Sequence, residues 1–164
     1  MNKKGFTLVE VVVSFSILSV LLASVIVFTI TYRDKVREEE VRTQLIDFKN
    51  TITKIVYDDI ISGKLKSIER CVGEAQCVNF IDTDNNTHLF KTVEVSTGTD
   101  RGLYIEYDGV RYLLPDSDLN KLYNPMCWFS GDFELKNYDE IYTLKVTFEH
   151  LSLHEVYEIL ITIN

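Results

Sequence analysis

The sequence predicts an α+β protein in which one long N-terminal α-helix, membrane-spanning in its first half, packs on a C-terminal antiparallel β-sheet. Three observations predict this class. An uncharged apolar run covers Val11 to Tyr32, and a stripe of apolar residues spaced three and four apart follows it up to Ser62. After Gly63 the apolar residues alternate with polar ones, as in half-buried strands.

The uncharged run is as long as a membrane span. About 20 apolar residues cross a bilayer as a helix, and the run from Val11 to Tyr32 meets that length. Its many Val and Ile residues are weak helix formers in water, but in lipid each backbone group must be bonded within the segment. Lys3 and Lys4 precede the run and favour a cytoplasmic N-terminus. A cleaved secretory signal, which has a shorter apolar stretch, and a plain one-pass anchor are the alternatives.

Glu10 argues against the plain one-pass anchor. Its carboxylate stands at the edge of the uncharged run, where an unpaired charge is costly to place in hydrocarbon. A plain anchor gives no reason for it. The sequence therefore predicts a partner that neutralises Glu10.

The residues from Lys3 to Glu10 read KKGFTLVE and lead directly into the apolar run. This pattern resembles the class III prepilin signal, the processing site shared by type IV pilins and pseudopilins, and the resemblance covers roughly residues 1–32. It implies that a prepilin peptidase cuts after Gly5 and methylates the new N-terminal residue, Phe6. It also implies that Glu10 meets the positive N-terminus of a neighbouring subunit during assembly.

The resemblance divides the chain into a leader at 1–5, a transmembrane and polymerisation helix at 6–32, and an extracytoplasmic helix-plus-sheet pilin domain at 33–164. It implies a structural subunit of a type IV pilus or of a related secretion or DNA-uptake filament. No Gly or Pro lies between Phe6 and Ser62, whereas major pilins of the family commonly carry such a breaker, which favours a minor pilin or pseudopilin. A single-pass sensor or adhesin domain without leader cleavage is the alternative.

The resemblance also implies partners and a location. The partners are other pilin subunits, the prepilin peptidase, the assembly machinery of the cytoplasmic membrane, and the lipid itself. The subunit is expected in the cytoplasmic membrane with its N-terminus inside, and in an extracellular filament after assembly. The formal net charge of −8 disfavours direct binding to nucleic acid.

Beyond the membrane the helix is expected to continue from Arg33 to Ser62 and to stop at Gly63. Its apolar stripe is assigned to packing on the chain's own sheet, and a heptad-based dimer is the alternative. The stripe consists of Val41, Leu45, Phe48, Ile52, Ile55 or Val56, and Ile60.

The strands follow from the alternating pattern and the turn residues. A hairpin is expected with strands at 103–107 and 110–114, joined by Asp108-Gly109, a dipeptide that suits a type I′ turn. Further strands are expected at 77–82, 87–96 and 127–136, and a terminal hairpin at 141–149 and 155–163.

No catalytic motif, cofactor or metal site is expected, so the chain is assigned as a non-enzyme. Asp82, Asp84 and Asn86 begin like a calcium loop, but Thr87 and Val93 replace its glycine and glutamate, so a polar turn is predicted. His150 and His154 flank a hairpin turn, where helical spacing has no meaning. The loop carboxylates, including Asp116 and Asp118, are assigned to solvated surface.

Three cysteines allow one intramolecular disulfide. Cys71 and Cys77 bracket a short segment that a disulfide could close, and oxidation is permitted outside the membrane. Pairing with Cys127, which stands beside Trp128 in an expected core strand, and fully reduced thiols are the alternatives.

Overall fold

The structure is a computed structural model, and it describes residues 7–63, 65–99, 101–118, 126–138 and 141–163. The chain divides into two compact units between Glu40 and Val41, and each is described by itself. The boundary lies within a single element, the helix α1 (Leu8–Gly63). The sequence predicted this helix over Phe6–Ser62 with a stop at Gly63, so its extent is close to the prediction.

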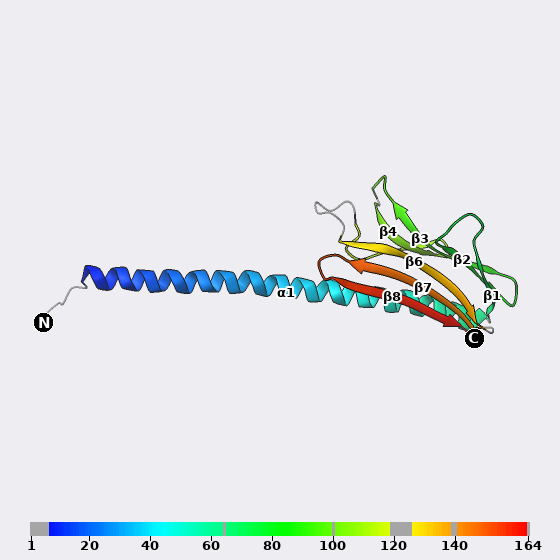
Figure 1. Cartoon of the computed structure of the whole chain (residues 1–164), viewed down its shortest axis with the longest axis horizontal. Helices are drawn as coiled ribbons and strands as arrows, with labels where there is room; N and C mark the ends of the chain where they lie inside the picture. The colour runs from blue at the N-terminus through cyan, green and yellow to red at the C-terminus, as the bar shows by residue number, and fades with distance from the viewer. Residues whose placement is uncertain (1–6, 64, 100, 119–125, 139–140, 164) are drawn as a thin grey trace. The chain divides into compact units, whose positions relative to one another are not determined.

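The second unit contains eight strands in two antiparallel sheets. The first sheet has the strand order β1-β2-β3-β4-β5 and the second has the order β6-β7-β8. Figure 1 shows β6, β7 and β8 side by side in yellow to red. The bounds are β1 Leu65–Arg70, β2 Cys77–Asp82, β3 Thr87–Val95, β4 Gly102–Tyr107, β5 Val110–Leu113, β6 Cys127–Tyr138, β7 Ile141–His150 and β8 Glu155–Ile163.

The fold class predicted from the sequence is confirmed, with two differences. The β-structure forms two sheets rather than one, and β1 was not predicted. β1 pairs with β2 in a register that shifts between Leu65 and Ser67, and it is mostly polar, so its sequence carries little period-two signal. The hairpin of β4 and β5 is confirmed, and both Asp108 (φ 48°) and Gly109 (φ 79°) have the positive φ that a type I′ turn requires.

One hydrophobic core joins the helix to both sheets. The predicted stripe supplies Leu45, Ile52, Val56 and Ile60 as buried residues, with Phe48 half-buried beside them. The Phe48 ring meets the Phe148 ring of β7 edge to face at 5.9 Å. Phe90 of β3 and Phe133 of β6 bring the two sheets into contact, with ring centroids 6.3 Å apart.

The helix also makes polar contacts with β8. The Tyr57 hydroxyl donates to the carbonyl oxygen of Thr162 at 2.8 Å and accepts from the amide of the same residue at 3.1 Å. At the other end of β8, Arg42 donates to both carboxylate oxygens of Glu155, at distances down to 2.7 Å. The Arg42 guanidinium holds the pKa of Glu155 below its usual value.

We expect Phe148→Ala to lower the free energy of unfolding by about 3–5 kcal/mol, because it leaves a cavity between helix and sheet. Phe148 is fully buried, and its ring stacks on Tyr157 with centroids 5.4 Å apart. Phe48→Ala is expected to cost less, since that side chain is only half-buried. The measurement is urea unfolding of residues 33–164, the predicted extracytoplasmic domain.

The control for this test is Val156→Ala, because Val156 is exposed on β8 and its truncation opens no cavity. Val156→Ala is expected to change the free energy of unfolding by no more than about 0.5 kcal/mol. Equal losses for Phe148→Ala and Val156→Ala would contradict the packing described here.

Candidate anchoring and assembly segment

The helix α1 begins with a reciprocal cap between Thr7 and Glu10. The Glu10 carboxylate accepts hydrogen bonds from the amide and the hydroxyl of Thr7, both at 2.9 Å. The Thr7 hydroxyl in turn accepts from the Glu10 amide at 3.3 Å. This is a capping box, which satisfies donors that the first turn of a helix otherwise leaves unpaired.

The cap adds to what the sequence predicted for Glu10. The carboxylate has a hydrogen-bonding partner within its own chain, whereas the sequence prediction expected its partner in a neighbouring subunit. Thr7 is neutral, so it does not cancel the charge of Glu10, and the assembly role of Glu10 stays a prediction. Gly5 and Phe6, the predicted processing residues, lie outside the described residues, as do Lys3 and Lys4.

The first unit offers its apolar side chains no cover from the described chain. Every residue from Thr7 to Glu40 is exposed, including the large apolar residues between Leu8 and Tyr32. Within the described residues, α1 is the one helix long and apolar enough to cross a membrane. Exposed apolar area on this scale is unfavourable in water, so lipid or other protein must cover it.

Five hydroxyl groups in this segment are hydrogen-bonded within the helix. Each donates to the backbone carbonyl four residues earlier, at 2.8–3.0 Å: Ser16, Ser19, Ser24, Thr29 and Thr31. Such bonds remove the cost of placing a free hydroxyl in hydrocarbon. These residues are therefore compatible with a membrane span.

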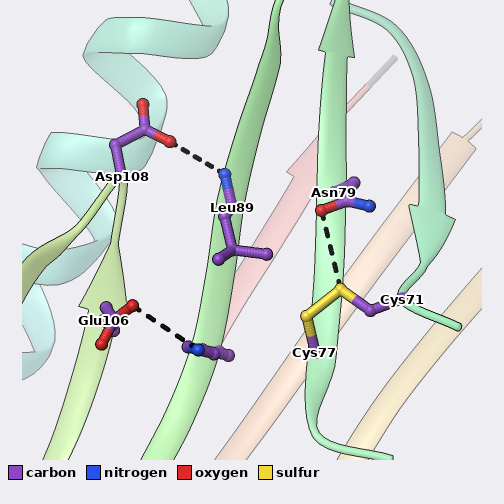
Figure 2. The surroundings of a disulfide bond; sticks show 7 residues. Cys71, Cys77, Asn79, Leu89, Glu106 and Asp108 are labelled. Atoms are coloured by element: carbon purple, nitrogen blue, oxygen red, sulfur yellow. Dashed lines mark hydrogen bonds and ion pairs between the residues drawn. A yellow bond between two sulfur atoms is a disulfide. The ribbon is translucent and has the colours of Figure 1, made fainter. Parts of the chain in front are cut away.

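The structure has a disulfide between Cys71 and Cys77, the pairing preferred from the sequence. The two Cα atoms are 5.4 Å apart, and the Cys71 amide donates to the Cys77 carbonyl. Figure 2 shows the disulfide at the turn between β1 and β2, with Asn79 beside the Cys71 sulfur. The distance from Asn79 Oδ1 to that sulfur is 3.6 Å. Cys127 is a free, buried thiol in β6, and burial raises its pKa to about 12, so it is unreactive as a nucleophile.

Asp116 was predicted to be a solvated surface carboxylate, and this prediction was wrong. Its carboxylate lies 3.2 Å from Nε2 of His150, which is buried at the end of β7. The other ring nitrogen, Nδ1, accepts from the Leu153 amide at 3.3 Å. These contacts suit a neutral His150 that donates through Nε2–H to Asp116, so the pair stabilises the turn after β7.

The residues that resembled a calcium loop form the polar turn between β2 and β3. Asp82 accepts from the amide and the side-chain nitrogen of Asn86, both at 2.7 Å, and its pKa is lowered chiefly by Asn86. The structure instead brings together three side chains that sequence reasoning did not connect: Asp59, His88 and Asp108. They are far apart in the chain, so no motif spacing could have grouped them.

Comparison with known proteins identifies the N-terminal segment. Residues 1–26 match the family model of the prokaryotic N-terminal methylation motif. The match confirms the resemblance to the type IV pilin signal that was drawn from Gly5, Phe6 and Glu10. No curated protein and no solved structure gives a significant match to the chain.

Proposed function

We propose, from the premise that this chain carries the type IV pilin methylation motif, that it is a structural subunit of a type IV pilus or a related filament. The motif supports prepilin-type processing, and the family that carries it is structural rather than enzymatic. Within that class we assign the chain as a minor pilin or pseudopilin of a pilus, secretion or DNA-uptake system, cut after Gly5.

The observation that carries the proposal is the order of features along the first unit. The motif at residues 1–26 overlaps a helix whose apolar side chains are exposed, and Glu10 caps the start of that helix. A soluble enzyme has no use for such a segment. A subunit that first resides in lipid and then packs against copies of the same helix uses all of it.

The proposed partners and location follow from this order. A prepilin peptidase cuts the leader on the cytoplasmic face, other pilin subunits cover the apolar helix in the filament, and membrane-bound assembly machinery moves the subunit between them. The motif and the helix indicate membrane anchoring. The domain at 33–164 then lies outside the cytoplasm before and after assembly.

Assignment to the minor class rests on helix continuity. No Gly or Pro interrupts the sequence from Phe6 to Ser62, and α1 has no break between Leu8 and Gly63. A helix without a breaker keeps its backbone hydrogen bonds when it moves from lipid to protein. This favours a subunit used at low copy over one that forms the body of an extensible fibre.

Mass spectrometry of the N-terminus tests the proposal. The mature protein is expected to begin at Phe6, with one methyl group on the terminal nitrogen. The mass must fall by that of residues 1–5 and rise by that of the one CH2 unit that methylation adds. An N-terminus at Met1 would instead support a single-pass sensor or adhesin domain, and cleavage within the apolar run would support a secretory signal.

A further inference from the structure

Three potential metal ligands converge on the surface of the second unit. Asp59 comes from the last turns of α1, His88 from β3, and Asp108 from the turn between β4 and β5. One ligand atom from each side chain lies within 4.8 Å of the other two. One imidazole and two carboxylates therefore meet from three separate elements.

Backbone contacts fix Asp108 in this cluster. The Asp108 amide donates to the Leu89 carbonyl at 2.9 Å, and its Oδ1 accepts from the Leu89 amide at 2.8 Å. Figure 2 shows the second of these bonds, with the carboxylate directed at Leu89. The remaining oxygen, Oδ2, lies 2.5 Å from Nδ1 of His88. Asp108 thus presents one oxygen to the cluster in a set direction.

His88 is held on its other sides. Its ring stacks on Tyr107 with centroids 6.4 Å apart and an interplanar angle of 19°. Its Nε2 lies 4.0 Å from a carboxylate oxygen of Asp82, which is buried and anchored by Asn86. Asp82 is not hydrogen-bonded to the ring at that distance, but it stands on the side where a carboxylate that accepts the ring N–H would orient a histidine ligand.

Tyr107 supplies an independent observation. Its side chain is 3% exposed, and its hydroxyl has no hydrogen-bond partner of acceptable geometry among the described residues. Tyr107 directly precedes Asp108 in the chain and its ring stacks on His88, so this buried hydroxyl belongs to the same part of the fold as the cluster. Buried polar groups are rarely left without a well-formed bond unless a further group belongs there.

We propose that Asp59, His88 and Asp108 bind a divalent transition-metal ion of the Zn²⁺ class. Zn²⁺ takes imidazole nitrogen and carboxylate oxygen at about 2.0–2.2 Å, so two ligand atoms on a tetrahedral ion stand roughly 3.3 Å apart. Small side-chain rotations bring the cluster to that spacing. The ion takes the place of the proton in the hydrogen bond between His88 and Asp108, and that proton is released to water.

The ligand set selects against the common hard cations. Ca²⁺ prefers six to eight oxygen ligands and Mg²⁺ an octahedron of oxygens and waters, whereas imidazole suits Zn²⁺ and its neighbours. Water fills the fourth position, and the Tyr107 hydroxyl is placed to bond to that water or to Asp59. Bound in this way, the ion ties the end of α1 to β3 and to the β4–β5 hairpin. It therefore stabilises the folded state over the unfolded one.

Calorimetric titration of Zn²⁺ into the full-length protein, purified in detergent without a histidine tag, tests the site. One ion per chain is expected. Asp59→Asn, His88→Gln and Asp108→Asn should each weaken binding by at least about tenfold, the effect expected for loss of a ligand or its support. The matched controls, Asp58→Asn on the same helix and His154→Gln in an exposed turn, should bind as the wild type does.

The choice of variant and a thermal-unfolding readout keep the test independent of folding defects. Asp59 is exposed, so Asp59→Asn disturbs packing least and is the decisive variant. Saturating Zn²⁺ should raise the melting temperature of the wild type by several degrees, on the order expected from ligand linkage, and should not raise that of Asp59→Asn. No binding by the wild type up to about 100 times the protein concentration would overturn the proposal. Equal binding by wild type and Asp59→Asn would overturn it as well.

Discussion

Replacing Gly5 with tryptophan is expected to leave the precursor uncut and in the membrane. Glycine at the cut gives a peptidase access to the backbone with no side chain in the way, and an indole at that position blocks it. Lys3 and Lys4 then stay attached on the cytoplasmic face. The processed fraction should fall close to zero, as measured by the intact mass of the membrane-extracted protein.

Asn2→Trp is the matched control for this experiment. It adds the same bulk to the leader, three residues before the cut, and should be processed normally. Filament fractions should contain no Gly5→Trp protein, because the uncut leader would bury charged Lys3 and Lys4 among packed helices. Mature protein of normal mass from the Gly5 variant would contradict prepilin processing of this chain.

Removing the charge of Glu10 is expected to lower incorporation into filaments by at least about tenfold, while membrane insertion and leader cleavage persist. After cleavage the Phe6 amine is a cation, and a neighbour's Glu10 can pair with it as both leave the headgroup region. Removing one partner of such a pair leaves the other charge buried and unpaired, which costs about 3–5 kcal/mol. Sheared filaments are compared with membranes for wild type and variants.

The cap at the helix start decides which variants to compare. Glu10→Gln keeps an acceptor for Thr7 and removes only the charge, whereas Glu10→Leu removes both. Thr7→Ala weakens the cap by about 1 kcal/mol and leaves the charge in place. If the charge of Glu10 drives assembly, both Glu10 variants should lose incorporation into filaments, whereas Thr7→Ala should lose little of it. Wild-type incorporation of Glu10→Gln would show that Glu10 serves its own helix alone.

Local patterns were sufficient to predict most elements of the fold. The helix from Leu8 to Gly63 is free of Gly and Pro until its last residue, so its extent could be predicted from composition and spacing. The β4–β5 hairpin followed from Asp108-Gly109, since few dipeptides accept two positive φ angles. In each case the deciding interactions lie within a few residues along the chain.

Long-range arrangement could not be predicted in the same way. A strand is assigned to a sheet by which neighbours it pairs with, and period-two patterning does not say where one sheet ends and another begins. The contact between Phe90 and Phe133 joins two sheets, yet neither residue differs in pattern from others in its strand. β1 was missed because its pairing with β2, rather than its own mostly polar sequence, makes it a strand.

The candidate sites also differ in whether they depend on local sequence patterns or on long-range contacts. The spacing of Thr7 and Glu10 is the signature of a capping box and is visible in the sequence, whereas the resemblance to pilins implies a different role for Glu10. The cluster of Asp59, His88 and Asp108 had no such signature, since its members meet only through the fold.

The Tyr57 hydroxyl has a consequence for crowded membranes. It occupies both the amide and the carbonyl of Thr162 on β8, where an adjoining strand would otherwise bind. In the filament proposed above, identical chains would stand at high local concentration, and an unpaired strand edge is then a template for irregular growth. At Thr162 the Tyr57 phenol takes up both backbone groups, which would disfavour strand-to-strand pairing between subunits at that position.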